Sequence, residues 1–373
     1  MRKFAILIVL LATAWPAKAA QNISVGQMEQ LLLTLRGQPE KKVAHALEDV
    51  DLSERASLAR LTQWEAEFPG ERTREELMRL ADESAFMDPP AEDVVQDPAP
   101  DTEAQQHILQ LAVEYVKSTA TRLPNLYATR ETTHFQNPFS PPAGSSMAGI
   151  TGTASLASAS DPGDLTMRSE SLYRQGRYAA TVSYRDGHEL LEGKKTPPSL
   201  GLITDGEFGT FLEVVLGDAL HGKLLWLRWE QRADKPEAVF QYAATETPSK
   251  FMVQVANGDN IQTIFPAYHG EIEIDPATGA ILRLSQVADM PPSLQAMRAS
   301  ILVDYGPVTL GQQEYICPMR GVAYSERPLP VRSVKPLSAP PIPLRQLNDI
   351  TFTDYHLFRA EARIVGDVGA SPQ

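Results

Sequence analysis

A single cysteine, Cys317, is present among the 373 residues, so no disulfide can form within the chain. Stability must therefore come from buried apolar area, and a hydrophobic fraction of 43% over this length is enough for about two domains with ordinary cores. Cys317 lies in a strand-like run between Ile316 and Pro318, which favours a buried, inert thiol over a nucleophile.

Long apolar runs are also lacking, because no segment after the amino terminus approaches the ~20 residues that a membrane-spanning helix needs. The amino-terminal run covers 4–14, follows Arg2 and Lys3, and is ended by Pro16. This order predicts a signal peptide over 1–19, which is removed from the mature chain. We expect an exported protein, periplasmic or secreted, that is not membrane-spanning after cleavage. A buried amino-terminal helix is the alternative.

Positive charge is scarce. The formal net charge is −13, and loss of the signal peptide would remove three more cationic side chains. Such a surface repels phosphate backbones, so we expect no nucleic-acid partner. The acidic excess is concentrated at 80–116, where a proline-rich centre predicts an acidic linker over 88–102. A calcium site is the alternative, but the spacing of carboxylates around a loop glycine is missing.

Common signatures of catalysis are absent from the sequence, including the Gly-x-Ser-x-Gly elbow, the glycine-rich dinucleotide motif and the paired Cys-x-x-Cys. His188 and Glu189 begin like a zinc-protease motif, but Glu192 stands where the second histidine ligand is required. The run 187–195 has the wrong spacing for a phosphate loop. We therefore predict no catalytic residues, no metal site and no cofactor.

Helical periodicity dominates the first part of the mature chain, and we predict a small helical bundle over 20–87. Four amphipathic helices are expected. Their starts are indicated by a capping box of Ser24 with Gln27, by Pro39, by the apolar repeat from 58, and by a second capping box of Thr73 with Glu76.

A second domain is predicted over 103–366, opened by a helix with a capping box of Thr102 and Gln105. From 126 the apolar period changes to two, which is typical of strands, and the short connections favour antiparallel pairing. The expected strands are 126–135, 169–191 with a turn at 186–187, 224–231, 238–243, 251–255, 268–275, 280–287, 299–305, 313–324 and 350–364. The proline and glycine of 274–281 predict a tight hairpin turn between two of them.

Three segments of this part are not expected to form regular structure. A run rich in small residues predicts a disordered loop at about 136–168. A basic, proline-rich segment is expected at 327–348, and a tail at 367–373 ends the chain.

One helix is expected among the strands, at 204–221, with Thr204 and Glu207 as its capping box. The predicted fold class is α+β, with the helical bundle followed by a curved, half-barrel-like antiparallel sheet packed on a helix. The sheet surface beneath that helix is the best candidate for a ligand site. Its predicted ligand-binding residues are Phe208, Phe211, Leu212, Trp226 and Trp229.

Charged side chains alternate with isoleucines along the strand at 268–275. His269, Glu271 and Glu273 share one face, which could form a metal or acid–base surface. We favour a solvated face, with Ile272 and Ile274 pointing into the core.

Three segments resemble a family of uncharacterised exported bacterial proteins: RYAATVSYRDG at 177–187, GLITDGEFG at 201–209 and AYHGEI at 267–272. That resemblance brings no activity with it. The order of strands and a crossing helix over 126–364 also resembles the half-barrel of periplasmic lipoprotein carriers and the related sigma-factor regulators. Those families have no catalytic residues to transfer, and the helices at 24–86 have no counterpart in a bare carrier domain.

We therefore predict a non-enzymatic, exported envelope protein that binds an apolar ligand, such as a lipid, or a lipidated protein on its curved sheet. The alternative is a protein–protein interaction or regulatory module, in which 88–102 and 327–348 recruit an envelope protein. A third is an exported hydrolase, in which His134, His188, His269 or His356 meets a carboxylate and a nucleophile.

Overall fold

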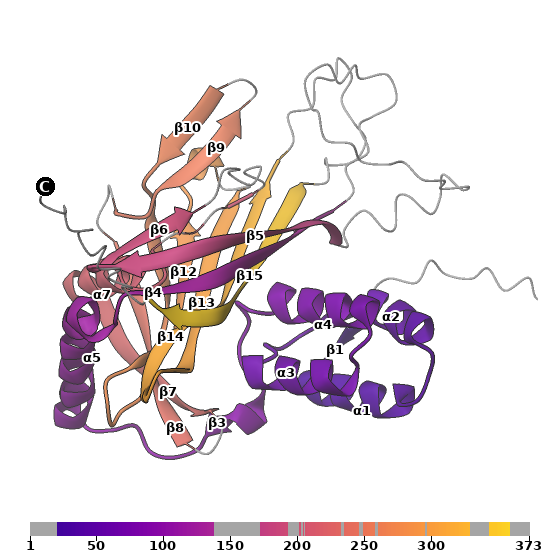
Figure 1. Ribbon diagram of the computed structural model, residues 1–373, viewed down its shortest axis with the longest axis horizontal. Coiled ribbons are helices and arrows are strands. Elements are labelled where there is room, and N and C mark those ends of the chain that lie inside the picture. Colours follow the sequence, from indigo (N-terminus) through magenta and orange to yellow (C-terminus); the bar gives the residue numbers. More distant parts are fainter. Residues whose placement is uncertain are drawn as a thin grey trace, which may run out of the picture.

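The described part of the chain is a mixed α and β structure built around one large sheet. A computed structural model describes residues 21–137, 172–192, 201–202, 204, 206–232, 235–245, 249–257, 260–294, 297–328 and 343–358. These residues contain six α-helices and an antiparallel sheet of 11 strands that is not closed (Figure 1). The prediction of a large antiparallel sheet combined with helices is confirmed.

Residues 21–88, which we call the N-terminal region, contain four helices that share one buried cluster, with Met28, Leu47 and Leu77 at its centre. The predicted capping box at Ser24 is confirmed, because Ser24 and Gln27 exchange hydrogen bonds at the start of the first helix. The helices are α1 (Val25–Leu35), α2 (Glu40–Glu48), α3 (Leu58–Glu67) and α4 (Glu71–Glu83). A parallel pair of short strands, β1 (Gln21–Ile23) and β2 (Val50–Leu52), was not expected.

The other three predicted capping boxes are wrong. Helix α4 begins after Gly70, so Thr73 lies within it. Helix α5 (Thr102–Arg122) begins after Asp101, whose carboxylate accepts the Ala104 N–H at 2.8 Å. Helix α7 (Thr210–His221) begins after Gly209, six residues later than expected. A threonine followed three residues later by a glutamate or glutamine is a short pattern, and nearby Asp and Gly residues start these helices instead.

The large sheet has the strand order β3-β7-β8-β11-β12-β13-β14-β15-β4-β5-β6, with antiparallel neighbours throughout. Its strands are β3 (Val94–Val95), β4 (Leu126–Gln136), β5 (Tyr173–Arg185), β6 (His188–Glu192), β7 (Lys223–Arg232), β8 (Lys235–Ala244), β11 (Ala267–Ile274), β12 (Ile281–Asp289), β13 (Arg298–Leu310), β14 (Gln313–Arg327) and β15 (Leu344–Leu357). A separate hairpin of β9 (Val253–Asn257) and β10 (Asn260–Ile264) projects beyond it (Figure 1). Short 3-10 turns lie at Ala91–Asp93 and Pro292–Leu294.

Two tight turns are where the sequence predicts them. Asp186 and Gly187 both have positive φ between β5 and β6, as a two-residue hairpin requires. Between β11 and β12, Gly279 has φ +75° and donates its N–H to the Asp275 carbonyl at 2.8 Å. An added Cβ at Gly279 would lie 2.3 Å from the backbone of Leu111, so this turn also contacts α5 closely.

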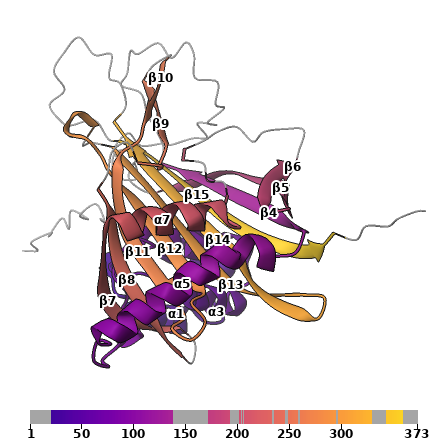
Figure 2. The same cartoon turned by 90° about the vertical axis from the view of Figure 1, so that its left-hand side faces the viewer.

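The sheet has a different covering on each face. Helices α5 and α7 cover one face, which we call the helix-covered face, and the N-terminal region covers part of the other, the outer face (Figure 1). Turned by 90°, α5 and α7 lie in front of the strands while α1 and α3 are behind them (Figure 2). The helix-covered face holds the largest apolar cluster, in which Leu216, Phe240 and Ile272 are buried.

Part of the acidic segment 88–102 contacts the rest of the protein, although 91–92, 96–99 and 101–102 are exposed. It contributes β3 to one edge of the sheet, and Asp93 pairs with Arg60 of α3. The indole N–H of Trp229 donates to the Pro98 carbonyl at 3.0 Å.

Several predicted segments lie wholly or mainly outside the described residues. These are the signal peptide at 1–19, the loop at 136–168 from 138 onward, the centre of the basic segment at 327–348, and the tail at 367–373. The last strand begins at Leu344, earlier than predicted, so the end of the basic segment belongs to the sheet. Among the described residues, none of the helices has both the length and the hydropathy that membrane crossing requires.

Candidate ligand pocket

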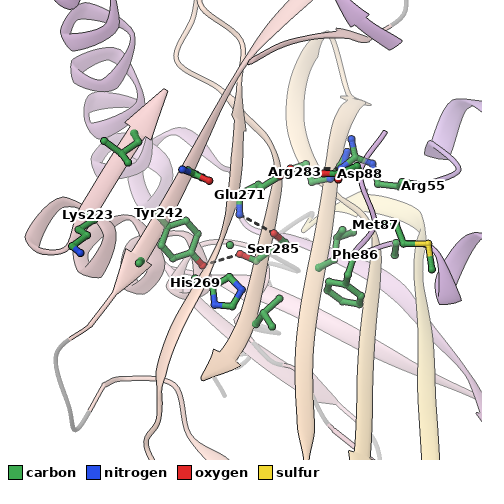
Figure 3. Close-up of a pocket in the computed structure, with 17 residues that line it drawn as sticks. Arg55, Phe86, Met87, Asp88, Lys223, Tyr242, His269, Glu271, Arg283 and Ser285 are labelled. Carbon is green, nitrogen blue, oxygen red and sulfur yellow. Dashed lines mark hydrogen bonds and ion pairs between the residues drawn. The ribbon is translucent and has the colours of Figure 1, made fainter. Parts of the chain in front are cut away.

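A cavity of about 400 Å³ lies between the outer face of the sheet and the segment that follows α4 (Figure 3). Its volume is within the ~300–1,000 Å³ range of small-molecule sites. The lining residues come from the N-terminal region and from five neighbouring strands: Arg55, Ala85, Phe86, Met87, Asp88, Lys223, Leu225, Gln241, Tyr242, Ala243, His269, Gly270, Glu271, Arg283, Ser285, Val287 and Leu302.

Strand alternation decides which side chains reach this pocket. On β11, Tyr268 and Ile272 point to the helix-covered core, so His269 and Glu271 point outward. Gly270 lies between them, and a Cβ there would lie 2.0 Å from the Ser285 carbonyl. The missing side chain lets the Tyr242 hydroxyl donate to that carbonyl at 2.7 Å, a bond that Figure 3 marks.

Apolar side chains form much of the pocket wall. Phe86 and Met87 come from the N-terminal region, while Leu225, Val287 and Leu302 come from β7, β12 and β13. Two of them are unusually accessible for large apolar residues, since Met87 is 41% and Leu225 57% exposed. The pocket therefore offers apolar surface that the protein itself does not cover.

Ion pairs line the end of the pocket beside Arg55 and Arg283, which we call the inner end. There Arg55 of the N-terminal region pairs with Glu230 of β7. Arg228 holds Glu271 through two hydrogen bonds, at 3.1 and 2.8 Å. Burial raises the pKa of Glu230, but Arg283 and Arg55 lower it more, to about 2. Glu230 is thus ionised, and both carboxylates are already paired with arginines.

The expectation of a solvated charged face on β11 holds for the exposed His269 but is wrong for Glu273. Glu273 is 4% exposed and pairs with Arg232 and Arg283, and Glu271 lies beside Arg55 beneath the N-terminal region. Ile272 and Ile274 are buried in the core, as predicted.

Further ion pairs attach α4 to the outer face. Arg320 of β14 lies between Asp82 of α4 and Asp349 of β15, and all three are buried. Burial, and then the neighbouring Asp349, raise the pKa of Asp82 well above its usual range, although Arg320 opposes the shift. Arg174 of β5 also pairs with Glu75 at 2.6 Å. The N-terminal region is therefore held on the sheet by arginine–carboxylate contacts.

The four candidate histidines do not converge. His269 contacts Asp289 at 2.8 Å and shares the pocket with Ser285, but no described hydrogen bond joins His269 to that serine. His134 is buried against Asn348, and burial lowers its pKa. His188 is exposed on the edge strand β6, and His356 packs on the Tyr127 ring. Within the described ranges, no cluster of three or more His, Cys, Asp or Glu is arranged to hold a metal.

The five predicted ligand-binding residues lie on the helix-covered side, and none of them lines this pocket. Leu212 is buried in the main core, with Phe211, Trp226 and Trp229 packed partly buried against it. A bulge on β7 between 226 and 228 turns both tryptophans to the same face, with ring centroids 4.8 Å apart. Phe208 belongs to a neighbouring cluster with Tyr184 and Phe352.

Thr204 and Glu207, expected to cap a helix, instead form a second buried polar cluster. The Thr204 hydroxyl donates to Glu207 at 2.5 Å, and Arg130 donates to both residues. Glu189 of β6 accepts the Phe208 N–H, and burial together with the nearby Glu207 carboxylate raises the pKa of Glu189 to about 8.

Among the pocket residues, the sequence patterns pointed only to His269 and Glu271. The walls come from 85–88 and from strands up to 302, and no local pattern links such distant segments. Cys317, by contrast, is buried as predicted, and burial raises the pKa of its thiol to about 12. Comparison with family models, curated proteins and solved structures finds no match to this chain.

Proposed function

We propose that the chain is an exported, non-enzymatic envelope protein that binds an apolar ligand or the lipid group of a partner. In this proposal the signal peptide at 1–19 directs export, and the sheet acts as a curved, half-barrel-like platform with the helical bundle docked on its outer face. The ligand lies in the pocket between that bundle and the sheet.

The observation that carries this proposal is the exposed apolar surface inside the pocket. Met87 and Leu225 are accessible there, and the half-buried Phe86 and Val287 extend the same surface. Burying such side chains against an apolar ligand is favourable by roughly 25 cal/mol per Å² removed from water. The charged groups at the inner end are mutually paired, so a ligand need not neutralise them.

Binding of a neutral, environment-sensitive dye such as Nile red to the mature chain tests the proposal. Leu225→Asp places a charge on the open apolar wall, and we expect dye affinity to fall at least about tenfold, which corresponds to about 1.4 kcal/mol. Leu190→Asp on β6 is the matched control, because Leu190 is 56% exposed but lies outside the pocket.

The location of binding is tested by a third variant. Phe211→Ala changes the originally predicted site beneath α7, and we expect it to leave dye affinity within about twofold of wild type. If Phe211→Ala abolishes binding while Leu225→Asp does not, the ligand lies on the helix-covered face. If the wild-type chain takes up neither dye nor lipid in native mass spectrometry, the proposed function is wrong.

A further inference from the structure

The pocket crosses five neighbouring strands of the sheet. Its lining runs from β7 through β8, β11 and β12 to β13, which are consecutive in the strand order. At a spacing of ~4.8 Å between strands, this path is about 19 Å long. A cavity of about 400 Å³ that spans five strands has room for an extended alkyl chain.

Charge is distributed unequally along this path. Lys223 stands at the β7 end, where it is exposed and forms no ion pair with any described residue. Asp88 stands at the opposite end, near Arg55 and Arg283, as Figure 3 shows. Its carboxylate likewise forms no ion pair among the described residues.

The charges between these ends are already compensated. Glu271 is held by Arg228, and His269 contacts Asp289. Among the described residues of the path, Lys223 is therefore the cation without a carboxylate partner, and Asp88 adds an unpaired negative charge at the far end, beside the paired arginines Arg55 and Arg283.

Apolar side chains line the path between Lys223 and Asp88. Leu225 shares β7 with Lys223, Val287 lies on β12, and Leu302 lies on β13 at the far end, where Phe86 and Met87 precede Asp88 in the chain. A chain whose head is at Lys223 would thus pass over Leu225 and end beneath Phe86 and Met87.

We propose that the ligand of this pocket is a single-chain amphiphile with a carboxylate head, bound with the head at Lys223 and the alkyl tail between Phe86, Met87 and Leu302. This inference rests on the proposed function and adds the chemical class and the direction of the ligand. A fatty acid is the simplest molecule of this class.

Competition against Nile red with dodecanoate and with dodecan-1-ol tests the inference, because the two probes share a chain length and differ in head charge. At neutral pH and low salt, wild type should bind dodecanoate about twofold to fivefold more tightly than the alcohol, the range of an exposed ion pair. Lys223→Gln should remove that preference and leave the alcohol unaffected. Lys41→Gln, an exposed lysine on α2, is the matched control and should leave both affinities unchanged.

Asp88→Asn tests the direction of the ligand, and it should strengthen dodecanoate binding by less than about twofold, since the tail lies at that end. A large gain in Asp88→Asn, with no effect of Lys223→Gln, would show that the head lies at the opposite end and overturn the inference. If wild type binds the two probes with equal affinity and Leu225→Asp binds neither, the preference for a carboxylate head is overturned. The apolar binding site is then still supported. If neither probe binds wild type, the proposed function itself fails.

Discussion

The two faces of the sheet hold their coverings by different forces, although the same strands supply both. On β11, Tyr268 and Ile272 enter the core beneath α5 and α7, while Glu271 and Glu273 form ion pairs on the other side. Apolar contact is non-directional and tolerates small shifts, whereas arginine–carboxylate pairs require particular geometry.

The contrast suggests what each face contributes. The helix-covered face supplies most of the stability, because burial of large apolar side chains is the dominant favourable term in folding. The ion pairs of the outer face fix the position of the N-terminal region, and the proposed ligand pocket lies beside those ion pairs. Variants that act on one face at a time can separate these contributions.

The largest loss of folding stability is expected on the helix-covered face. Phe240 of β8 is 1% exposed and packs edge-on against Trp226, with ring centroids 5.4 Å apart. Phe240→Ala should lower the free energy of unfolding by about 3–5 kcal/mol, because it removes buried contacts and leaves a cavity. Urea denaturation measures the loss, and Phe240→Leu should cost clearly less. A cost below about 1 kcal/mol for the alanine variant would contradict the assignment of stability to this face.

On the outer face the largest loss of folding stability is expected at Arg320. Arg320→Met leaves Asp82 and Asp349 buried together without their cation, which should cost about 3 kcal/mol in urea denaturation. Asp82→Asn leaves one arginine with one aspartate, so it should lower the free energy of unfolding by only about 1 kcal/mol. Equal costs for the two variants would show that Asp82 is needed as an anion.

The helices and strands themselves could be predicted from the sequence because their signals are local. The period-two runs and the 274–281 turn correspond to β11, β12 and their neighbours, and the apolar repeats correspond to α1 to α4. Start signals were less reliable, since Asp101 and Gly209, and not the threonines near them, precede α5 and α7.

The docking of the N-terminal region could not be predicted, because it depends on residues far apart in the chain. Outward-facing charges on an antiparallel strand normally meet water, which is why Glu273 was expected to be solvated. Arg55 and Glu230, which line the same interface, are separated by 175 positions. The pocket arises from that docking, so no local pattern could reveal it.

A smaller effect, dependent on pH, is expected at the edge of the sheet. The pKa of Glu189 is raised to about 8 in the folded chain, above its ordinary value near 4.5. The folded state therefore binds more protons than the unfolded state between these values, so this group makes stability fall as pH rises from about 4.5 to 8. We expect the decline between pH 6 and pH 8 to be about 1–2 kcal/mol larger in wild type than in Glu189→Gln.

Thermal or urea unfolding at several pH values measures this decline. Glu237, whose pKa burial also raises to about 8, should keep its own contribution in the Glu189→Gln variant. The same pH dependence in wild type and Glu189→Gln would show that the pKa of Glu189 is not raised in the folded chain.

The smallest effect is expected where an ion pair of the outer face has no covering. Arg177 of β5 contacts Glu131 of β4 at 3.4 Å, and their side chains are 43% and 38% exposed. Because water screens this pair, Arg177→Gln should change the free energy of unfolding by less than about 0.5 kcal/mol. Arg177 and Arg320 lie on the same face, so the difference between their variants measures what burial beneath the N-terminal region adds. Similar costs at both positions would mean that the covering contributes nothing to the ionic contacts.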